Sequence, residues 1–236
     1  MTTLDTVTLV AIAGNEASIL PTVRALFLSS KLLEFADVKI ICPANIAGAE
    51  WLTVVESPPL DLEGYTRFCI NDLKNHIDTN HCLLIQWDGF IINADLWEDT
   101  FLEYDYIGAP WGHGPPTWCN RVGNGGFSLR SKKFLEASAE LEYEPDSKYT
   151  DILKQVPTWL PTPEDWFICV YNYEHMMKRN IKFPDVETAL RFSVEYPRME
   201  KLYHPESLET YKSFGFHGNF NIAAMSTLRD LFYEEV

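Results

Sequence analysis

Several features that mark particular protein classes are absent from this sequence of 236 residues. It has five cysteines but no Cys-x-x-Cys pair, which argues against a disulfide framework and a structural zinc site. No apolar run is long enough to span a bilayer, and the first residues include Asp5 but no basic stretch of the kind found in a secretory signal. We therefore expect no transmembrane segment and a cytoplasmic location, where thiols stay reduced.

Positive charge is also scarce, because 19 Lys and Arg stand against 34 Asp and Glu, for a net charge of −15. Such a field repels nucleic acids and anionic membranes, so we expect no nucleic-acid partner. An anionic ligand would need a metal ion or a local group of bases. Hydrophobic residues make up 46% of the chain, enough for a sizeable core. No repeat or linker divides the sequence, which favours a single domain over residues 1–236.

The first part of the chain alternates between apolar runs and helical periodicity. It predicts strands at residues 7–13, 38–42, 51–55 and 82–85 and helices at 18–35 and 65–75. Apolar strands that alternate with helices indicate a mainly parallel sheet covered on both faces. Ligands bind such sheets at the carboxyl ends of the strands, and Gly14 and Asp88 follow two of these predicted strands.

The second half is less regular. A short strand at 127–129 and helices at 131–142 and 164–180 are predicted, and two Gly- or Pro-rich stretches, 108–126 and 144–162, separate them. Long loops in compact domains are often lids or binding loops.

Asp88 ends an apolar run and precedes Gly89. An acid in this place is costly unless it binds a cation or a polar ligand. One hypothesis is a ligand for a hard cation such as Mn2+ or Mg2+. The alternative is a strand-end turn or a helix N-cap, which is the common role of Asp.

A glycine-rich stretch, VGNGGFSLR, contains Asn124, Gly125 and Gly126. Its backbone N–H groups are able to face an anion, although Asn-Gly is also the usual dipeptide of a hairpin turn. The basic residues near it, which favour the anion hypothesis, are Arg121, Arg130, Lys132 and Lys133.

Two further clusters contain titratable groups. Glu164 and Asp165 follow Pro163 at the start of a predicted helix, where acids also favour the helix dipole. One of them is a candidate general base whose pKa is raised by burial against Trp166. His217, in FGFHG, is a candidate metal ligand or an ordinary core histidine. His113 is a further residue of interest in a loop rich in Gly and Pro. The loop indoles of Trp111, Trp118 and Trp159 are suited to stacking on sugar rings or to core packing.

The order of these four clusters resembles that in the GT-A fold of nucleotide-sugar glycosyltransferases, which has an Asp-x-Asp motif, a glycine-rich loop, an x-Glu-Asp motif and a C-terminal His. The strings QWDGFI, YDYIGAPW, VGNGGFSLRS, PED, AxRFSxE and GFHG are similar, more narrowly, to an uncharacterised family of glycosyltransferase-like domains. The resemblance covers residues 65–218. It implies an α/β fold with a Rossmann-related, mainly parallel central sheet flanked by helices and a smaller antiparallel part in the second half. It also implies a nucleotide-binding half at 1–100 and an acceptor-binding half at 101–236.

The resemblance also implies a role for each cluster. Asp88 and His217 would bind Mn2+ or Mg2+, and the first Asp of the DXD-like motif is replaced by Gln86. Asp165 would be the general base, with Glu164 as its neighbour. The residues implied to lie along the donor and its junction with the acceptor are Gly14, Asn15, Tyr65, Arg67, Gln86, Trp87, Asn124, Gly125 and Gly126.

The implied activity is metal-dependent transfer of a sugar from a nucleoside-diphosphate sugar donor to a hydroxyl of a glycan or other acceptor, in polysaccharide biosynthesis. The metal would stabilise the leaving diphosphate and a carboxylate would deprotonate the acceptor, which predicts inversion at the anomeric carbon. Two other hypotheses stay open. One is a non-catalytic nucleotide- or glycan-binding protein of the same fold, favoured by Gln86, and the other is a metal-dependent nucleotide-sugar hydrolase.

Overall fold

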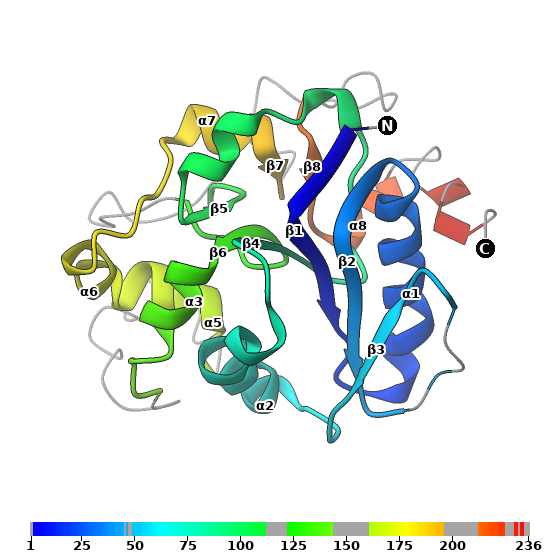
Figure 1. The fold of residues 1–236 in the computed structure, drawn as a ribbon, viewed down its shortest axis with the longest axis horizontal. Coiled ribbons are helices and arrows are strands. Elements are labelled where there is room, and N and C mark those ends of the chain that lie inside the picture. Colours follow the sequence, from blue (N-terminus) through cyan, green and yellow to red (C-terminus); the bar gives the residue numbers. More distant parts are fainter. Residues whose placement is uncertain are drawn as a thin grey trace.

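A central sheet of six strands, with helices on both faces, forms the frame of the described part of the chain (Figure 1). The structure, a computed structural model, describes residues 2–44, 46, 49–111, 122–143, 161–195, 212–224, 229–230 and 232–233. The predicted features that lie outside the described residues are His113, Trp118, Arg121, Trp159 and most of the stretch 144–162.

The strands are β1 (Thr2–Ile12), β2 (Leu33–Cys42), β3 (Thr53–Glu56), β4 (His81–Ile85), β5 (Tyr106–Gly108), β6 (Phe127–Ser131), β7 (Ser193–Val194) and β8 (Gly215–Phe216). The α-helices are α1 (Glu16–Ser30), α2 (Leu62–Arg67), α3 (Lys132–Ser138), α5 (Glu164–Trp166), α6 (Tyr173–Lys178), α7 (Val186–Phe192) and α8 (Asn219–Ala224). The π-helical segments are η1 (Phe68–Asp72) and η5 (Phe167–Tyr171), and the 3₁₀ segments are η2 (Leu73–His76), η3 (Ala94–Leu96) and η4 (Asp99–Glu103).

The strand order is β3-β2-β1-β4-β6-β5. Strands β1 to β4 pair in parallel, whereas β6 runs antiparallel to both β4 and β5. The predicted mainly parallel sheet with an antiparallel part in the second half is therefore confirmed. A separate pair, β7 and β8, is parallel.

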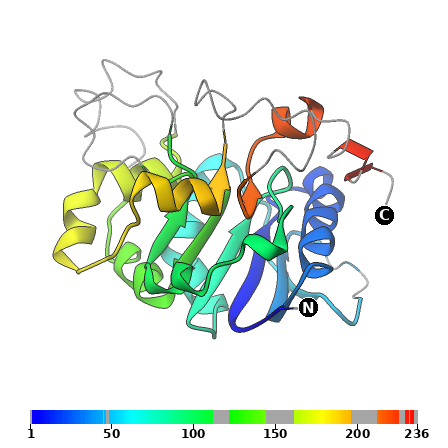
Figure 2. The same ribbon diagram turned by 90° about the horizontal axis from the view of Figure 1, so that it is seen from above.

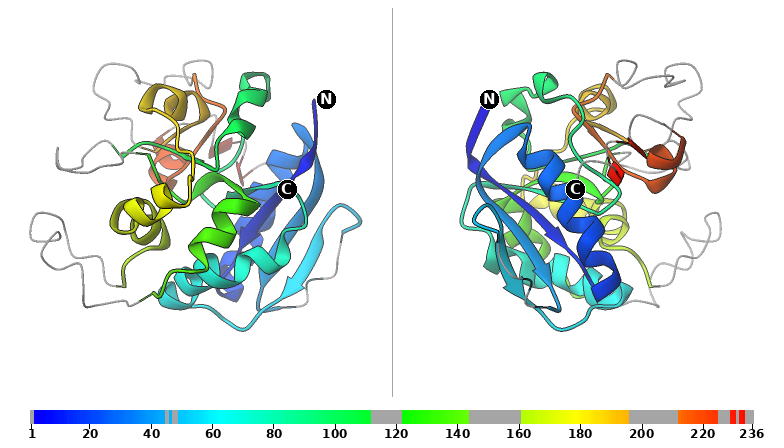
Figure 3. Two further views of the ribbon diagram at one scale, coloured as in Figure 1. Left: turned by 60° about the vertical axis from the view of Figure 1, so that its left-hand side comes forward. Right: turned by 90° about the vertical axis from the view of Figure 1, so that its right-hand side faces the viewer.

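Alternating side chains of β1 show that both faces of the sheet are buried. Val7 and Leu9 belong to the hydrophobic cluster on the side of α1 and α7. Val10 and Ile12 belong to a second cluster with η1, α3 and η5. Figures 2 and 3 show these helices on opposite sides of the strands. Because each face is covered, the strands read as nearly continuous apolar runs.

The chain leaves the first helix earlier than predicted. α1 ends at Ser30, and residues 33–35, which were predicted to be helical, begin β2 instead. The reason is pairing along the sheet, since Leu33 lies opposite Thr2 and Phe35 opposite Leu4. The predicted helices at 65–75 and 164–180 are confirmed as helical segments, but each contains a π-helical stretch.

The topology brings several loops to one edge of the sheet. β1, β3 and β4 end there, and β6 begins there because it runs antiparallel to β4, with Ile85 opposite Phe127. The loops that follow Ile12 and Ile85 and precede Phe127 therefore meet at this edge. Among the described residues, no helix has the length and apolar character needed to cross a membrane.

Candidate active site

Polar segments that are far apart in the sequence lie together where β4 ends. The N–H of Gln86 donates to the carbonyl of Gly126 at 2.8 Å. On the other side, the N–H of Gly218 donates to the carbonyl of Asp88 at 2.9 Å. The Asp88 carboxylate also accepts from the N–H of Asn219 through Oδ2 at 2.9 Å. Asp88 lies in a turn at the end of β4, as one interpretation of the sequence predicted. Its Oδ2 binds the first residue of α8, and its other oxygen lies on the side of His217.

The imidazole of His217 lies between three acceptor groups. Its Nε2 is 3.4 Å from Asp88 Oδ1 and 3.2 Å from Gln86 Oε1. Its Nδ1 is 3.4 Å from Glu195 Oε1. Burial by itself would lower the pKa of His217, but the carboxylates of Asp88 and Glu195 outweigh this and raise the pKa to about 10. Without a bound cation, His217 is therefore an imidazolium at neutral pH.

The small β7–β8 sheet holds this histidine in place. The N–H of His217 donates to the carbonyl of Val194 at 2.9 Å, which continues the pairing of the two strands. The side-chain amide of Asn221 donates to the carbonyls of both His217 and Glu195, at 2.8 and 3.0 Å. On the opposite side the ring packs closely against Gly126, where an added Cβ would lie 2.1 Å from Nε2. Only glycine leaves room for the ring at this position.

Asp165 lies across the loop from these groups. Its Oδ2 accepts from the N–H of Gly125 at 2.9 Å and its Oδ1 from the N–H of Trp166 at 2.7 Å. Burial and the nearby charge of Glu164 raise the pKa of Asp165 to about 7, although the two N–H groups oppose the change. This agrees with the raised pKa expected for a general base in this motif.

Glu164 has a different environment from its neighbour. It forms an ion pair of 3.0 Å with Arg130, and the side chain of Arg130 is fully buried. The expectation that Arg130 and the adjacent lysines offer positive charge to an anion is therefore not met by their positions. Arg130 is engaged inside the protein, Lys133 pairs with Asp105, and Lys132 does not line the cavity described below.

The glycine-rich stretch is not a two-residue hairpin turn. β5 and β6 pair from Gly108 and Ser128 outward, so the connection between them runs through a long segment that includes 122–126. The hydroxyl of Tyr106 donates to the carbonyls of Gly123 and Asn124 at 2.6 and 3.1 Å, which fixes the loop against the sheet.

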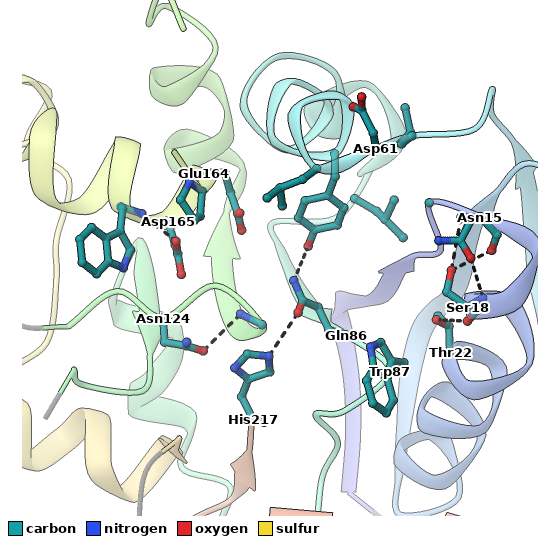
Figure 4. A pocket seen from close by; sticks show the side chains of 18 of the residues that line it. Asn15, Ser18, Thr22, Asp61, Gln86, Trp87, Asn124, Glu164, Asp165 and His217 are labelled. Carbon is teal, nitrogen blue, oxygen red and sulfur yellow. Dashed lines mark hydrogen bonds between the residues drawn. The ribbon is translucent and has the colours of Figure 1, made fainter. Parts of the chain in front are cut away.

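A cavity of about 690 Å³ opens beside these groups. This size is typical of pockets for small ligands and cofactors. Figure 4 shows Asn124, Glu164, Asp165 and His217 on one side, Asn15, Ser18 and Thr22 on the other, and Gln86 between them. The predicted site residues that line the cavity are Gly14, Asn15, Tyr65, Gln86, Trp87, Asn124, Gly126, Glu164, Asp165 and His217.

Three predicted residues are not part of the cavity lining. Asp88 lies against His217, and Gly125 donates its N–H to Asp165. Arg67 is the more distant exception, because its guanidinium pairs with Glu63 and donates to the carbonyl of Tyr143. A direct contact of Arg67 with a ligand in this cavity stays a prediction without geometric support.

The described lining of the cavity is acidic. It includes the carboxyl groups of Asp61, Glu164, Asp165 and Glu195, and no Lys or Arg of the described residues is among it. His217 is the basic group that faces the same space. An anionic ligand would therefore meet a repulsive wall unless a cation accompanied it.

Some residues of the site were not assigned a role from the sequence. Glu195 was noted only as the last residue of AxRFSxE, yet it contacts His217 and lines the cavity. Its signal resembles that of Asp88, because both are acids within three residues of the end of a short buried strand. Trp111, which was predicted to stack on a sugar or to pack in the core, also lines the cavity. The other lining residues that were not predicted are Ile12, Ser18, Thr22, Leu60, Asp61, Leu62, Pro163 and Trp166.

Comparison with known families gives one match. Residues 54–217 match the family described as "Protein of unknown function (DUF5672)", which covers most of the chain. The chain belongs to this family. The matched range begins in β3 and ends at His217, so it includes the resemblance strings found in the sequence except the last glycine of GFHG. No curated protein matches the chain.

Several solved structures are similar at low sequence identity. One is a glycosyltransferase involved in the glycosylation of the major capsid of PBCV-1, with 14% identity, a TM-score of 0.49, and coverage of 89% of this chain and 91% of that one. Another is the glycosyltransferase GlyE of Streptococcus pneumoniae TIGR4, with 12% identity, a TM-score of 0.41, and coverage of 72% and 43%. A third is the bifunctional IspDF of Campylobacter jejuni, with 13% identity, a TM-score of 0.40, and coverage of 66% and 55%. The chain thus matches about half the length of the last two proteins.

Proposed function

We propose that this protein is a metal-dependent glycosyltransferase that moves a sugar from a nucleoside-diphosphate sugar to an acceptor hydroxyl. One observation carries the proposal. Three atoms that are able to bind a cation, Asp88 Oδ1, Gln86 Oε1 and, once deprotonated, His217 Nε2, meet beside the cavity that also contains Asp165, a carboxyl group with a raised pKa. A cation site and a base on one cavity are what direct displacement of a diphosphate by a hydroxyl requires.

The donor atoms fit a divalent metal. Asp88 Oδ1 is buried and accepts no hydrogen bond among the described residues, so it is available to a cation. Among those residues, no group of three or more His, Cys, Asp and Glu is arranged for a metal. Asp88, His217 and the amide oxygen of Gln86 would therefore be completed by ligand oxygens, as is usual for Mg2+ or Mn2+ shared with a diphosphate. His217 would give up its Nε2 proton on binding the ion. The metal, when bound, supplies positive charge to the leaving diphosphate.

Asp165 is the proposed base. A pKa of about 7 leaves a large fraction of the carboxyl ionised at neutral pH while it keeps a high affinity for a proton. The N–H groups of Gly125 and Trp166 hold both oxygens in place. The Asp165 carboxylate would take the proton of the acceptor hydroxyl as that oxygen attacks, and attack from the side opposite the leaving group inverts the anomeric carbon. Glu164, which pairs with Arg130, raises the pKa of Asp165 through its charge and is not itself the proposed base.

The other end of the cavity is available for the nucleoside. Gly14 approaches Leu60 so closely that an added Cβ would lie 2.4 Å from the Leu60 carbonyl oxygen, and the two segments are joined by the Leu60 N–H. Asn15 caps α1 through Ser18, which gives this wall a fixed shape. Tyr65 and Trp87 add aromatic surface.

A thermal-unfolding screen of nucleoside diphosphates, with and without Mn2+, tests the proposal. At a nucleotide concentration about 100 times the Kd, binding stabilises the folded protein by about 2.7 kcal/mol, which for a chain of this length is a rise in Tm of roughly 5–10 °C. We expect the rise with one class of nucleotide and only when Mn2+ is present. No rise with any nucleoside diphosphate in the presence of Mn2+ would refute the proposal.

A binding protein of the same fold is the second candidate, because Gln86 replaces an expected acid and its amide nitrogen is engaged by the Tyr65 hydroxyl at 3.0 Å. The nucleotide that stabilises the protein is then offered as its sugar derivatives with a panel of glycan acceptors. Transfer that depends on the acceptor supports the transferase. Release of sugar into water at the same rate without acceptor supports a hydrolase, and no turnover supports the binding protein.

A further inference from the structure

Glu195 and His217 are neighbours because of the β7–β8 sheet. Each residue directly follows its strand, and the strands are parallel, so the two side chains leave the sheet at the same end. Asn221 joins their carbonyls with one side-chain amide. The two side chains are largely buried, with 13% and 15% exposure. These hydrogen bonds fix the backbone of both residues, and the carboxylate of Glu195 lies next to the imidazole.

The two nitrogens of the imidazole face different partners. Nε2 is the atom near Asp88 and Gln86, and Nδ1 is the atom near Glu195. An ion bound to Nε2 would lie in the plane of the ring on the side away from Nδ1. The contact between Glu195 and Nδ1 therefore does not bring this carboxylate to the same ion. It affects the orientation of the imidazole ring.

We propose that Glu195 is the positioning residue of the cation site, and that its carboxylate accepts the Nδ1–H of His217 and so aims Nε2 at the ion beside Asp88. The inference rests on the proposed function, since it concerns the metal of that same cavity. An imidazole that binds a metal through one nitrogen is commonly oriented by a carboxylate on the other. Here the second carboxylate also offsets the positive charge that the ion brings to a largely buried ring.

The side chain of Glu195 has no other partner that would explain its burial in the described part of the chain. The backbone carbonyl, which Asn221 holds, is unaffected by a change of side chain. Truncation at this position should therefore leave the β7–β8 sheet intact and act mainly on the imidazole, with a smaller electrostatic effect on Asp165.

The experiment measures Mn2+ binding to the nucleotide-free protein, from the electron paramagnetic resonance signal of the free ion. We expect Glu195→Ala to weaken Mn2+ binding about 10–100-fold, the usual effect of removing such a partner. Glu195→Gln keeps an oxygen that can accept from Nδ1–H, so it should recover part of the affinity. Glu187→Ala, at an exposed position of α7, is the matched control and should bind Mn2+ as the natural protein does. Metal-free thermal unfolding of all variants reports on folding.

The outcomes separate this inference from the proposed function. Glu195→Ala and Glu195→Gln that bind Mn2+ within twofold of the natural protein overturn the positioning role, whatever nucleotide binding shows. Nucleotide binding that needs no Mn2+, with no Mn2+ bound by the natural protein, also overturns it. Conversely, Mn2+ affinity that falls in Glu195→Ala and partly returns in Glu195→Gln supports it, even if no nucleoside diphosphate binds and the transferase proposal fails. If Glu195→Ala does not fold, the comparison of Glu195→Gln with the natural protein decides.

Discussion

Asp165 is a carboxyl group whose surroundings oppose its ionisation, and this is why we propose it as the general base. It is partly exposed to the cavity, but burial and Glu164 raise its pKa to about 7. We expect Asp165→Asn to keep donor binding, because the amide oxygen still accepts from the Gly125 N–H, and to lower the transfer rate by at least about 100-fold, the usual contribution of a general base. Steady-state rates together with nucleotide-dependent thermal shifts measure the two effects. Transfer at the natural rate would remove Asp165 from the base role.

The raised pKa of Asp165 also predicts how the transfer rate and the stability of the folded protein depend on pH. The base must be ionised to act, so transfer should rise with pH to a plateau above about 7. Stability should change in the opposite direction. Because the folded-state pKa of about 7 exceeds the ordinary value of 3.8, the folded protein holds a proton that the unfolded chain releases between these pH values. Its contribution to stability is therefore present below pH 4 and lost as pH rises through about 7.

Asp165→Asn cannot titrate, which makes it the control for that pH dependence. Its free energy of unfolding, from urea titrations at pH 5 and pH 8, should fall less between the two values than that of the natural protein. Equal changes in both proteins would show that the pKa of Asp165 is not raised in the folded state.

At the scale of elements, the loop before β6 packs closely against the residue that follows β8, because Gly126 lies against the ring of His217. Gly126→Ala would place a Cβ 2.1 Å from His217 Nε2, closer than atoms approach. The ring must leave its present position beside Asp88, and we expect the Mn2+-dependent rise in Tm with nucleotide to be lost. Thermal unfolding with and without Mn2+ and nucleotide measures this.

Gly64→Ala is the matched control, because the nearest atoms to its added Cβ are side-chain atoms at 3.3 Å, and alanine favours a helix. It should keep the response to metal and nucleotide. A Gly126→Ala protein with the natural response would mean that the ring position seen here is not required for binding.

The elements with long apolar runs were predictable from sequence, and the short ones were not. β1, β4 and the parallel order follow from continuous apolar strands between helices. β5, β7 and β8 have two or three residues each and give no periodic signal. They form because strands distant in the sequence pair with their backbone groups, β6 with β5 and β8 with β7. Glu195 went unassigned for this reason, since its role depends on a pairing that a single sequence does not reveal.

The candidate residues that the sequence indicated and that lie at or directly beside the cavity have unusual local settings. Asp88 and His217 each precede a glycine, and Asp165 lies two residues after Pro163. Charge was a poorer guide. Arg130 belonged to the most basic stretch and is fully buried against Glu164, because a strand buried on both faces places its long side chains inside the protein.

At the scale of the whole molecule, net charge and cavity charge have the same sign. The chain has a net charge of −15, and acids line the cavity without a Lys or Arg among the described residues. In the absence of metal we expect nucleotide binding too weak to raise the Tm, and this weak binding should be tighter at 150 mM salt than at 10 mM, because the Debye length falls from about 30 Å to about 8 Å and the repulsion weakens. Calorimetric titration with a chelator present measures this. Weaker binding at the higher salt concentration would indicate basic residues at the site that the described part of the chain does not show.

The contact between the ends of β4 and β8 also bears on how the protein is made. Gln86 and His217 are 131 positions apart in the chain, as are Asp88 and Asn219. The four parallel strands emerge from the ribosome well before the imidazole that faces Asp88 is synthesised. During that interval the carboxylate lacks both its imidazole and the N–H of Asn219. The site therefore closes only after the parallel strands have had time to pair.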